Sequence, residues 1–206
     1  MGSGVARVST RFKVVALAAS TGGPKALSYL LSKLPTSFGA AILIVQHLPP
    51  QFVASFAERL SQTSPLPVRV ARQGEVLVPG QVLVAPGDRH LLLVGSGPPN
   101  GEWRVQLSTA PPLGGHRPSA DPLFASLADV CGPYGIGVVL TGMGSDGTKG
   151  LLALRQAGGL TLGESSVTCS VFGMPRSAWE GGALERLLPL WDLPMALSTA
   201  VAATFQ

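Results

Sequence analysis

Four apolar segments of strand length constrain the fold of this 206-residue chain more than any other feature. They lie at residues 13–18, 41–46, 135–140 and 159–162, and helix-like segments separate them. Each is apolar almost throughout, which is typical of strands that are buried on both faces of a parallel sheet. Strands of this kind alternating with helices predict an α/β fold, a doubly wound, mostly parallel sheet flanked by helices.

The middle of the chain carries a different pattern. Short strand-like segments are separated there by Pro-Gly and Pro-Asn-Gly turns, which predict an antiparallel hairpin insert or edge extension. In the helix predicted from Asp121, that residue is expected to be the N-cap, with Pro122 at the first helical position. The short strands are expected at 68–71, 81–85, 90–94 and 103–107, a last strand near 184–188, and helices at 24–34, 51–60, 121–130, 148–157 and from 193.

Composition and charge exclude several classes of protein. Hydrophobic residues make up 46% and charged residues 13% of the chain, which is too apolar for a disordered protein. The net charge is +4, but three basic residues fall in the acid-free segment 1–13, which is expected to be a flexible leader or linker remnant. No basic patch interleaved with aromatic residues remains, so no nucleic-acid partner is expected.

No apolar run is long enough for a membrane span, so no membrane insertion is expected. Cys131 and Cys169 are expected to be free thiols.

Polar residues follow three of the predicted strands. Ser20 follows the first strand, His47 the second, and Asp146 lies in the glycine-rich segment after the third. The carboxyl ends of parallel strands meet at one edge of a sheet, where ligands bind. A hydroxyl, an imidazole and a carboxylate at one edge are the components of a nucleophilic triad. The order Ser, His, Asp differs from that of the α/β-hydrolases.

Structural roles could also explain these residues. Ser20 could cap the helix that follows it, His47 could occupy a turn, and Asp146 could cap the helix predicted from residue 148. The segment 142–147 also matches G-x-G-x-x-G between a strand and a helix, with Glu164 seventeen residues further on, as in a dinucleotide-binding unit. Residues 20–23 could bind an anion at a helix N-terminus.

Eight segments in order along the chain resemble the catalytic domain of bacterial chemotaxis receptor methylesterases, the CheB family. The resemblance as a whole runs from the first predicted strand to near residue 188. These segments are 17–24 (LAASTGGP), 46–50 (QHLPP), 56–60 (FAERL), 85–88 (APGD), 116–121 (HRPSAD), 140–147 (LTGMGSDG), 156–158 (QAG) and 171–176 (VFGMPR).

The resemblance implies a serine esterase that hydrolyses glutamate methyl esters on the cytoplasmic helices of chemoreceptors, releasing methanol, and that also deamidates receptor glutamines. Ser20 would be the nucleophile, His47 the general base and then acid, and Asp146 the residue that orients His47. The Met143 backbone N–H and Thr21 would supply oxyanion donors. No metal and no organic cofactor are expected. The residues expected to hold the oxyanion or substrate are Thr21, Gly22, Met143, Gly144, His116 and Arg117, and Met143, Phe172 and Met174 would line the slot for the methyl ester.

The resemblance also has departures. Members of the family usually carry an N-terminal receiver domain, for which residues 1–13 offer no room, so 14–206 is expected to be a catalytic domain, either truncated or stand-alone. Ser145 stands where Asn is expected. The implied partners are the methylated cytoplasmic domain of a chemoreceptor and a receiver domain in a full-length protein, and the implied location is the cytoplasm. His90 and the pair His116–Arg117 are predicted in loops, with solvation or a structural tie as the alternative to a role in the site.

Overall fold

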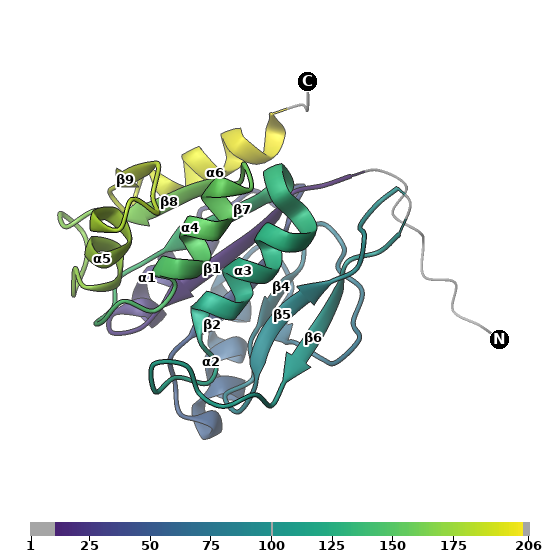
Figure 1. The fold of residues 1–206 in the computed structure, drawn as a ribbon, viewed down its shortest axis with the longest axis horizontal. Helices are drawn as coiled ribbons and strands as arrows, with labels where there is room; N and C mark the ends of the chain where they lie inside the picture. Colours follow the sequence, from purple (N-terminus) through teal and green to yellow (C-terminus); the bar gives the residue numbers. More distant parts are fainter. Residues whose placement is uncertain (1–10, 100, 204–206) are drawn as a thin grey trace.

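Seven parallel strands form the central sheet in the computed structural model, which describes residues 11–99 and 101–203. Their order is β3-β4-β2-β1-β7-β8-β9, so β1 lies at the centre (Figure 1). The strands are Val14–Ala19 (β1), Ala41–Gln46 (β2), Val68–Val70 (β3), Val82–Val84 (β4), Gly135–Val139 (β7), Leu160–Glu164 (β8) and Arg186–Leu188 (β9). The helices are Gly23–Ser32 (α1), Pro50–Thr63 (α2), Ala120–Cys131 (α3), Thr148–Gln156 (α4), Met174–Glu180 (α5) and Leu193–Ala202 (α6), with a short 3₁₀ helix at Gly132–Tyr134.

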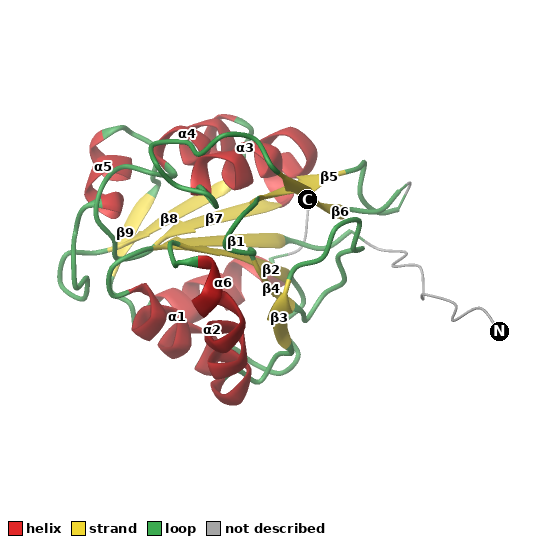
Figure 2. Ribbon diagram, turned by 90° about the horizontal axis from the view of Figure 1, so that it is seen from below, coloured by secondary structure: helices red, strands yellow, loops and turns green. Residues whose placement is uncertain are grey.

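Helices cover both faces of the sheet. Figure 2 shows α3, α4 and α5 on one face and α1, α2 and α6 on the other. Alternate residues of β1 point to opposite faces, so Ala16 packs in the core under α3 and α4 while Leu17 packs in the core under α1 and α2. All six residues of β1 are buried, which explains why the segment is apolar without alternation.

The middle of the chain confirms only part of the expected antiparallel insert. His90–Val94 (β5) and Arg104–Ser108 (β6) form the predicted antiparallel hairpin, and β5 packs against α3. The two preceding segments extend the edge of the main sheet, which was one predicted alternative, but the antiparallel direction was wrong, because β3 and β4 pair in parallel. Residues 71–81 between them are long enough to return the chain to the same end of the sheet, and turn residues alone do not reveal that direction.

The start of α3 also differs from the prediction. Its N-cap is Ser119, and Asp121 lies inside the first turn. The Asp121 carboxylate instead accepts a hydrogen bond from the backbone N–H of Gly150 in α4, at 2.8 Å. A partner from another helix therefore outweighs the local capping preference of Asp121.

The first described residues contact the domain. Phe12 is buried and packs edge-on against Trp103, with ring centroids 5.0 Å apart. The Arg11 guanidinium donates to the Tyr134 hydroxyl at 2.8 Å. The rest of the predicted leader, residues 1–10, lies outside the described residues. Across the described part of the chain, none of the helices has the length and apolar character needed to cross a bilayer.

The strand order reverses between β1 and β7. From β1 the chain proceeds to β2 on one side, and it later returns to β7 on the other side. Helices at such a point diverge to opposite faces, which leaves a crevice at the carboxyl ends of the strands. The segments that follow β1 and β7 meet in this crevice.

Candidate active site

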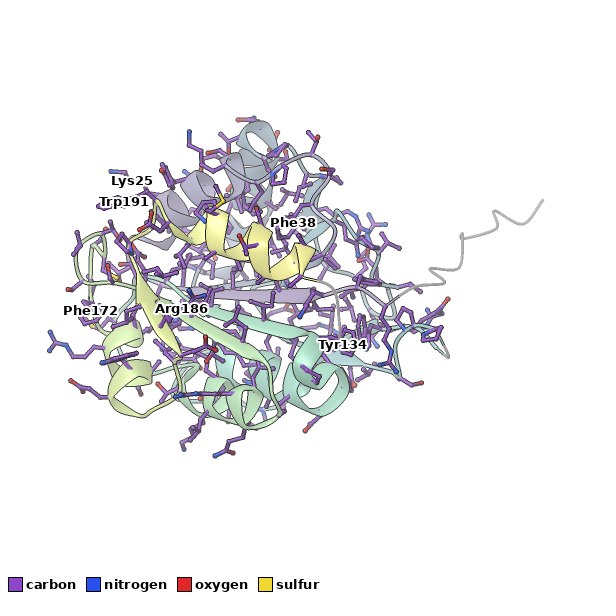
Figure 3. All side chains as sticks on the ribbon, turned by 90° about the horizontal axis from the view of Figure 1, so that it is seen from above. Lys25, Phe38, Tyr134, Phe172, Arg186 and Trp191 are labelled. Atoms are coloured by element: carbon purple, nitrogen blue, oxygen red, sulfur yellow. The ribbon has the colours of Figure 1, made fainter. Side chains whose placement is uncertain are left out.

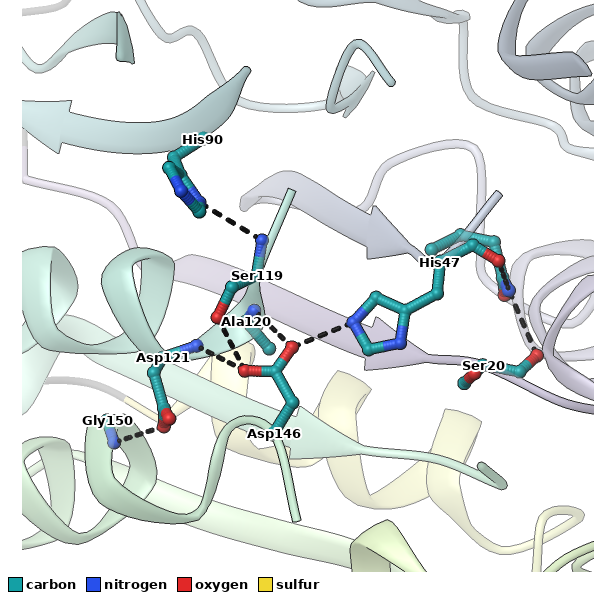
Figure 4. Close-up of polar contacts among 9 residues, drawn as sticks. Ser20, His47, His90, Ser119, Ala120, Asp121, Asp146 and Gly150 are labelled. Carbon is teal, nitrogen blue, oxygen red and sulfur yellow. Dashed lines mark hydrogen bonds and ion pairs between the residues drawn. The ribbon is translucent and has the colours of Figure 1, made fainter. Parts of the chain in front are cut away.

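Ser20, His47 and Asp146 lie together at this crevice. Ser20 is the first residue after β1, His47 the first after β2, and Asp146 lies in the loop between β7 and α4. Figure 4 shows the His47 ring between Asp146 and Ser20. The three candidate residues, which come from segments far apart in the sequence, therefore lie at one edge of the sheet, where the strand pattern predicted them.

The hydrogen bond between His47 and Asp146 determines which nitrogen of the ring can act as a base. His47 Nε2 lies 2.7 Å from Asp146 Oδ2, and both side chains are less than 10% exposed. An ionised carboxylate only accepts hydrogen bonds, so Nε2 carries the proton and donates. His47 Nδ1 is therefore unprotonated in the neutral ring, and it is buried without a hydrogen-bond partner in the described part of the chain. Nδ1 is the atom available to take a proton.

The N-terminus of α3 holds the Asp146 carboxylate. Ser119 Oγ donates to Oδ1 at 2.6 Å, and the backbone N–H groups of Ala120 and Asp121 donate at 2.7 and 3.2 Å. Burial alone would raise the pKa of Asp146, but hydrogen bonds from His47, Ser119 and Ala120 lower it below its usual value. The positive end of the α3 dipole favours the same ionised form. Asp146 is thus a fixed carboxylate, and its alternative role as the cap of α4 is wrong because it binds α3.

Asp121 and Asp146 link α3 and α4 reciprocally. Asp146, which precedes α4, binds the N-terminus of α3, while Asp121 in α3 binds Gly150 in the first turn of α4. Burial raises the pKa of Asp121, and the charge of Asp146 raises it further, against the hydrogen bond from Gly150. The position of the carboxylate therefore depends on the packing of these two helices.

His90 supports this arrangement from behind, contrary to the solvated role expected for it. It is 2% exposed, in β5. Its Nδ1 accepts the backbone N–H of Ser119 at 3.1 Å, so its Nε2 carries the proton that the Pro111 carbonyl accepts, also at 3.1 Å. A chain of hydrogen bonds thus runs from His90 through Ser119 and Asp146 to His47 (Figure 4). The sequence contained the HRPSAD motif, but nothing in it indicated that Ser119 would contact Asp146.

Close backbone contacts place Ser20. Its backbone N–H donates to the Thr141 carbonyl at 3.0 Å, and its carbonyl accepts the Gln46 side-chain amide at 2.9 Å. A Cβ at Gly142 would lie 2.8 Å from the Ser20 Cβ, so only glycine fits there. Gly22 has φ of 83°, and a Cβ on it would come within 2.6 Å of Ser170. Gly22, and not Ser20 or Thr21, is the N-cap of α1, so the capping alternative for Ser20 is wrong.

Thr141 connects the loops on the Ser20 side. Its hydroxyl donates to the Thr21 carbonyl at 2.9 Å and accepts the Val171 backbone N–H, also at 2.9 Å. Its own backbone N–H donates to Glu164 Oε2 at 2.9 Å, beneath the loops. Glu164 is fully buried, which prevents it from reaching a ribose hydroxyl as the dinucleotide-binding alternative requires.

The remaining predicted site residues divide by exposure. Met143, Gly144 and Thr21 are exposed around the crevice, and the Met143 side chain is 70% exposed. Met174 is fully buried and its sulfur lies against Gly142, so it packs under the loop. Phe172 precedes α5 at the same end of the molecule (Figure 3), with the Arg176 guanidinium 5.6 Å from its ring centroid.

His116 and Arg117 come from the loop between β6 and α3, on the carboxylate side. The His116 ring stacks on the His47 ring. The Arg117 guanidinium donates to the carbonyls of Thr109 and Ala110, both at 3.2 Å, which agrees with the alternative of a structural tie. An open pocket of about 260 Å³ adjoins them, lined by His47, Leu48, Pro49, Pro50, Gly87, Gly115, His116, Arg117 and Pro118.

Neither cysteine has the lowered thiol pKa that is typical of a reactive cysteine. Burial raises the pKa of the Cys131 thiol, and burial near Glu164 raises that of Cys169 to about 12, so both are protonated at neutral pH. Both cysteines are free. Within residues 11–99 and 101–203, no three His, Cys, Asp or Glu side chains are grouped as ligands for a metal ion. The chemistry that the site supports is acid–base and nucleophilic.

The comparisons with known proteins agree on one family. The model of the CheB methylesterase family matches residues 15–197. A protein-glutamate methylesterase/protein-glutamine glutaminase of Photorhabdus laumondii is 46% identical over 191 residues, which are 93% of this chain and 53% of that protein. A protein of the same name from Pseudomonas aeruginosa is 48% identical over 185 residues, 90% of this chain and 52% of that protein. The chain thus spans about half the length of these relatives.

The same similarity holds in three dimensions. The crystal structure of the Thermotoga maritima CheB methylesterase catalytic domain superposes with a TM-score of 0.89 at 40% sequence identity. The match covers 93% of this chain and 100% of that one. The part of the longer relatives that this chain matches is therefore similar to a catalytic domain.

Proposed function

The chain belongs to the CheB methylesterase family, and from this premise we propose that it is a serine esterase that demethylates chemoreceptors. Its substrates would be glutamate methyl esters on the cytoplasmic helices of a receptor, and its products a glutamate carboxylate and methanol. The observation that carries the proposal is the fixed 2.7 Å contact between His47 Nε2 and Asp146, which leaves Nδ1 as a base on the side of Ser20. A receptor substrate of this kind would place the enzyme in the cytoplasm.

Acylation begins with transfer of the Ser20 hydroxyl proton to His47 Nδ1. Ser20 Oγ attacks the ester carbonyl carbon, and the negative charge moves to the carbonyl oxygen. Asp146 stabilises the imidazolium that forms, because its carboxylate accepts the hydrogen bond from Nε2 throughout. The tetrahedral intermediate then collapses, His47 returns the proton to the methoxy oxygen, and methanol leaves.

Water completes the cycle. His47 Nδ1 takes a proton from a water molecule, whose oxygen attacks the acyl carbon of the Ser20 ester. Collapse of the second tetrahedral intermediate releases the glutamate carboxyl group and returns the proton to Ser20 Oγ. Both halves of the reaction use the same two nitrogens of His47, so no further acid or base is required.

Backbone N–H groups near Ser20 would stabilise the oxyanion. We assign this role to Met143 and Thr21, with Gly22 and Gly144 allowing the substrate to approach the backbone. The hydroxyl of Thr141 supports this assignment, because it ties the Thr21 loop to the Val171 loop beside Met143. A donor that is already in place when charge develops contributes about 3–4 kcal/mol to transition-state stabilisation.

The same intermediate allows deamidation of receptor glutamines. Attack of Ser20 on a glutamine side chain gives an identical acyl-enzyme, with ammonia as the leaving group in place of methanol. The related proteins that are named protein-glutamine glutaminases support this second activity. The remaining half of those longer proteins leads us to propose a receiver domain as the partner of residues 14–206, which would form the catalytic domain.

Methanol release from methylated receptor membranes tests the proposal. We expect release by the wild-type protein and none above background by Ser20→Ala at equal folded concentration. A small activated ester, p-nitrophenyl acetate, tests the triad without a receptor. Hydrolysis of this ester by the wild type but not by Ser20→Ala supports the triad even if the receptor offered is the wrong one. Equal hydrolysis by both proteins would contradict the proposal.

A further inference from the structure

A second imidazole lies flat against His47. The ring centroids of His116 and His47 are 3.9 Å apart, and the ring planes differ by 4°. His47 is thus held at Nε2 by Asp146 and across its face by His116. The proposed reaction assigns no step to His116.

The backbone on both sides of His116 is tied down. The backbone N–H of His116 donates to the Leu113 carbonyl at 2.9 Å, and the Leu113 N–H donates to the His116 carbonyl at 3.0 Å. Three residues later, Ser119 binds the carboxylate of Asp146 through its hydroxyl. The loop that carries His116 is therefore built on the same carboxylate that holds His47.

One hydrogen bond does not fix the orientation of a ring. A ring held only at Nε2 can still rotate about the line from Nε2 to the carboxylate, and such rotation moves Nδ1 out of alignment. Proton transfer requires the base within about 2.6–3.2 Å of the hydroxyl oxygen, so small rotations matter. A parallel ring at contact distance opposes this rotation, because tilting His47 would bring its atoms into His116.

We propose that His116 is a positioning residue for the proposed esterase reaction: its flat ring holds the plane of His47 so that Nδ1 keeps the orientation needed to take the Ser20 proton. The inference rests on the proposed function of Ser20 and His47. A neutral ring face also attracts the imidazolium that forms on His47 during acylation, as aromatic faces attract cations.

The charged groups around His116 favour its neutral form. Burial lowers the pKa of His116, the proximity of His47 lowers it further, and Asp146 opposes these effects. If His116 were protonated, its charge would oppose the formation of a cation on His47. A neutral His116 ring is therefore the form that suits the proposed role.

Two substitutions separate the flat ring from the ionisable group. His116→Phe keeps a flat ring that does not titrate, and His116→Ala removes the ring. With p-nitrophenyl acetate, we expect His116→Ala to lower kcat about tenfold with KM changed less than about twofold, and His116→Phe to retain kcat within about threefold of the wild type at pH 8. Leu113→Ala, an exposed side chain on the same loop, is the matched control and should keep wild-type kcat.

A spectroscopic measurement tests the inference independently of turnover. The chain has three histidines, so the imidazole C–H signals in a proton–carbon correlation spectrum can be assigned by substitution. We expect the imidazole C–H signals of His47 to shift in His116→Ala, because the ring current of the stacked ring is lost, and to stay nearer their wild-type positions in His116→Phe, which keeps an aromatic ring.

The outcomes distinguish the inference from the proposed function. Wild-type kcat and unchanged His47 ring signals in His116→Ala would overturn the inference, as would equal losses in His116→Ala and His116→Phe with both folded. Thermal unfolding and the remaining histidine signals establish folding. If Ser20→Ala still hydrolysed the ester, the proposed function would fail, whereas the shift of the His47 ring signals in His116→Ala would still report the stacking.

Discussion

The two nitrogens of His47 face opposite environments. On the Nε2 side, the Asp146 carboxylate receives four hydrogen bonds, from His47, Ser119, Ala120 and Asp121. On the Nδ1 side, the nitrogen has no partner in the described residues, and the neighbouring loop carries Met143, 70% exposed. The carboxylate side is therefore fully hydrogen-bonded, whereas on the hydroxyl side, toward Ser20, Nδ1 is buried but has no partner among the described residues.

This difference separates two requirements of catalysis. Charge stabilisation is effective when the dipoles are fixed before the reaction begins, which the α3 N-terminus achieves on the carboxylate side. The nucleophile needs space for a substrate and for a carbonyl group that changes shape. Substitutions on the carboxylate side should therefore affect both stability and activity, whereas substitutions on the hydroxyl side should affect activity alone.

Ser20→Ala should give the largest loss. We expect kcat to fall at least about 10⁴-fold, because the covalent route is removed. The midpoint of thermal unfolding should change by less than about 2 °C, since the loop is held by backbone contacts of Ser20. Methanol release and calorimetry measure the two quantities. A large loss of stability would contradict the separation of the two sides.

Asp146→Asn should come next, with kcat lowered about 10³–10⁴-fold. The carboxylate accepts hydrogen bonds on both oxygens, but the Asn amide has only one oxygen. Its NH₂ group would therefore face another hydrogen-bond donor, either His47 Nε2 or the N-terminus of α3. We expect a loss of stability as well, because buried donors lose their partner. Urea unfolding alongside the p-nitrophenyl acetate assay provides the measurement, and wild-type stability in this variant would argue against the carboxylate side being complete.

Two serines, one preceding α3 and one within it, separate effects on catalysis from effects on stability at the carboxylate side. Ser119→Ala should lower kcat about tenfold and the free energy of unfolding by about 1.5–3 kcal/mol, because a hydrogen bond to a charged group is lost. Ser126 in the same helix also makes buried hydrogen bonds, to Leu93 and Leu123. Ser126→Ala should therefore reduce stability with kcat unchanged. Equal kcat values for the two variants would mean that the hydrogen bond from Ser119 to Asp146 has no role in catalysis.

Low pH should reduce the contribution of the Asp146 carboxylate to the stability of the folded protein. The pKa of Asp146 is lower in the folded protein than its usual value of 3.8. Its contribution to stability is therefore fully present above about pH 4 and is lost as the pH falls through the folded pKa. We expect the free energy of unfolding to fall more steeply between about pH 4 and 2 in the wild type than in Asp146→Asn. If the free energy of unfolding, measured with urea, fell equally with pH in both proteins, Asp146 would not be ionised in the folded protein.

Met143→Ala should have the smallest effect. The oxyanion donor that we propose is the backbone N–H, which this substitution keeps, and the exposed side chain adds little to the core. We expect kcat for p-nitrophenyl acetate within about twofold of the wild type and stability within about 0.5 kcal/mol. A tenfold loss of kcat would show that the Met143 side chain itself contributes to the site around Ser20.

The sheet and the position of the site could be predicted from local patterns. The strand Ala41–Gln46 has the predicted bounds, because an apolar run of this length between turn residues has few other structures available. Ser20, His47 and Asp146 were predicted at one edge because parallel strands end together. The directions of β3 and β4 were not predictable, since short strands with Pro-Gly turns suit either direction.

Hydrophobic spacing and chain order were thus enough to indicate a doubly wound sheet and the three polar residues that follow its central strands. The partners of those residues depended on the folded chain. Asp146 binds the start of α3 and not the adjacent α4, His90 supports Ser119 from β5, and His116 lies on His47. Each contact joins segments more than 20 residues apart, so it forms only when helices and strands pack against each other, and no local preference specifies it.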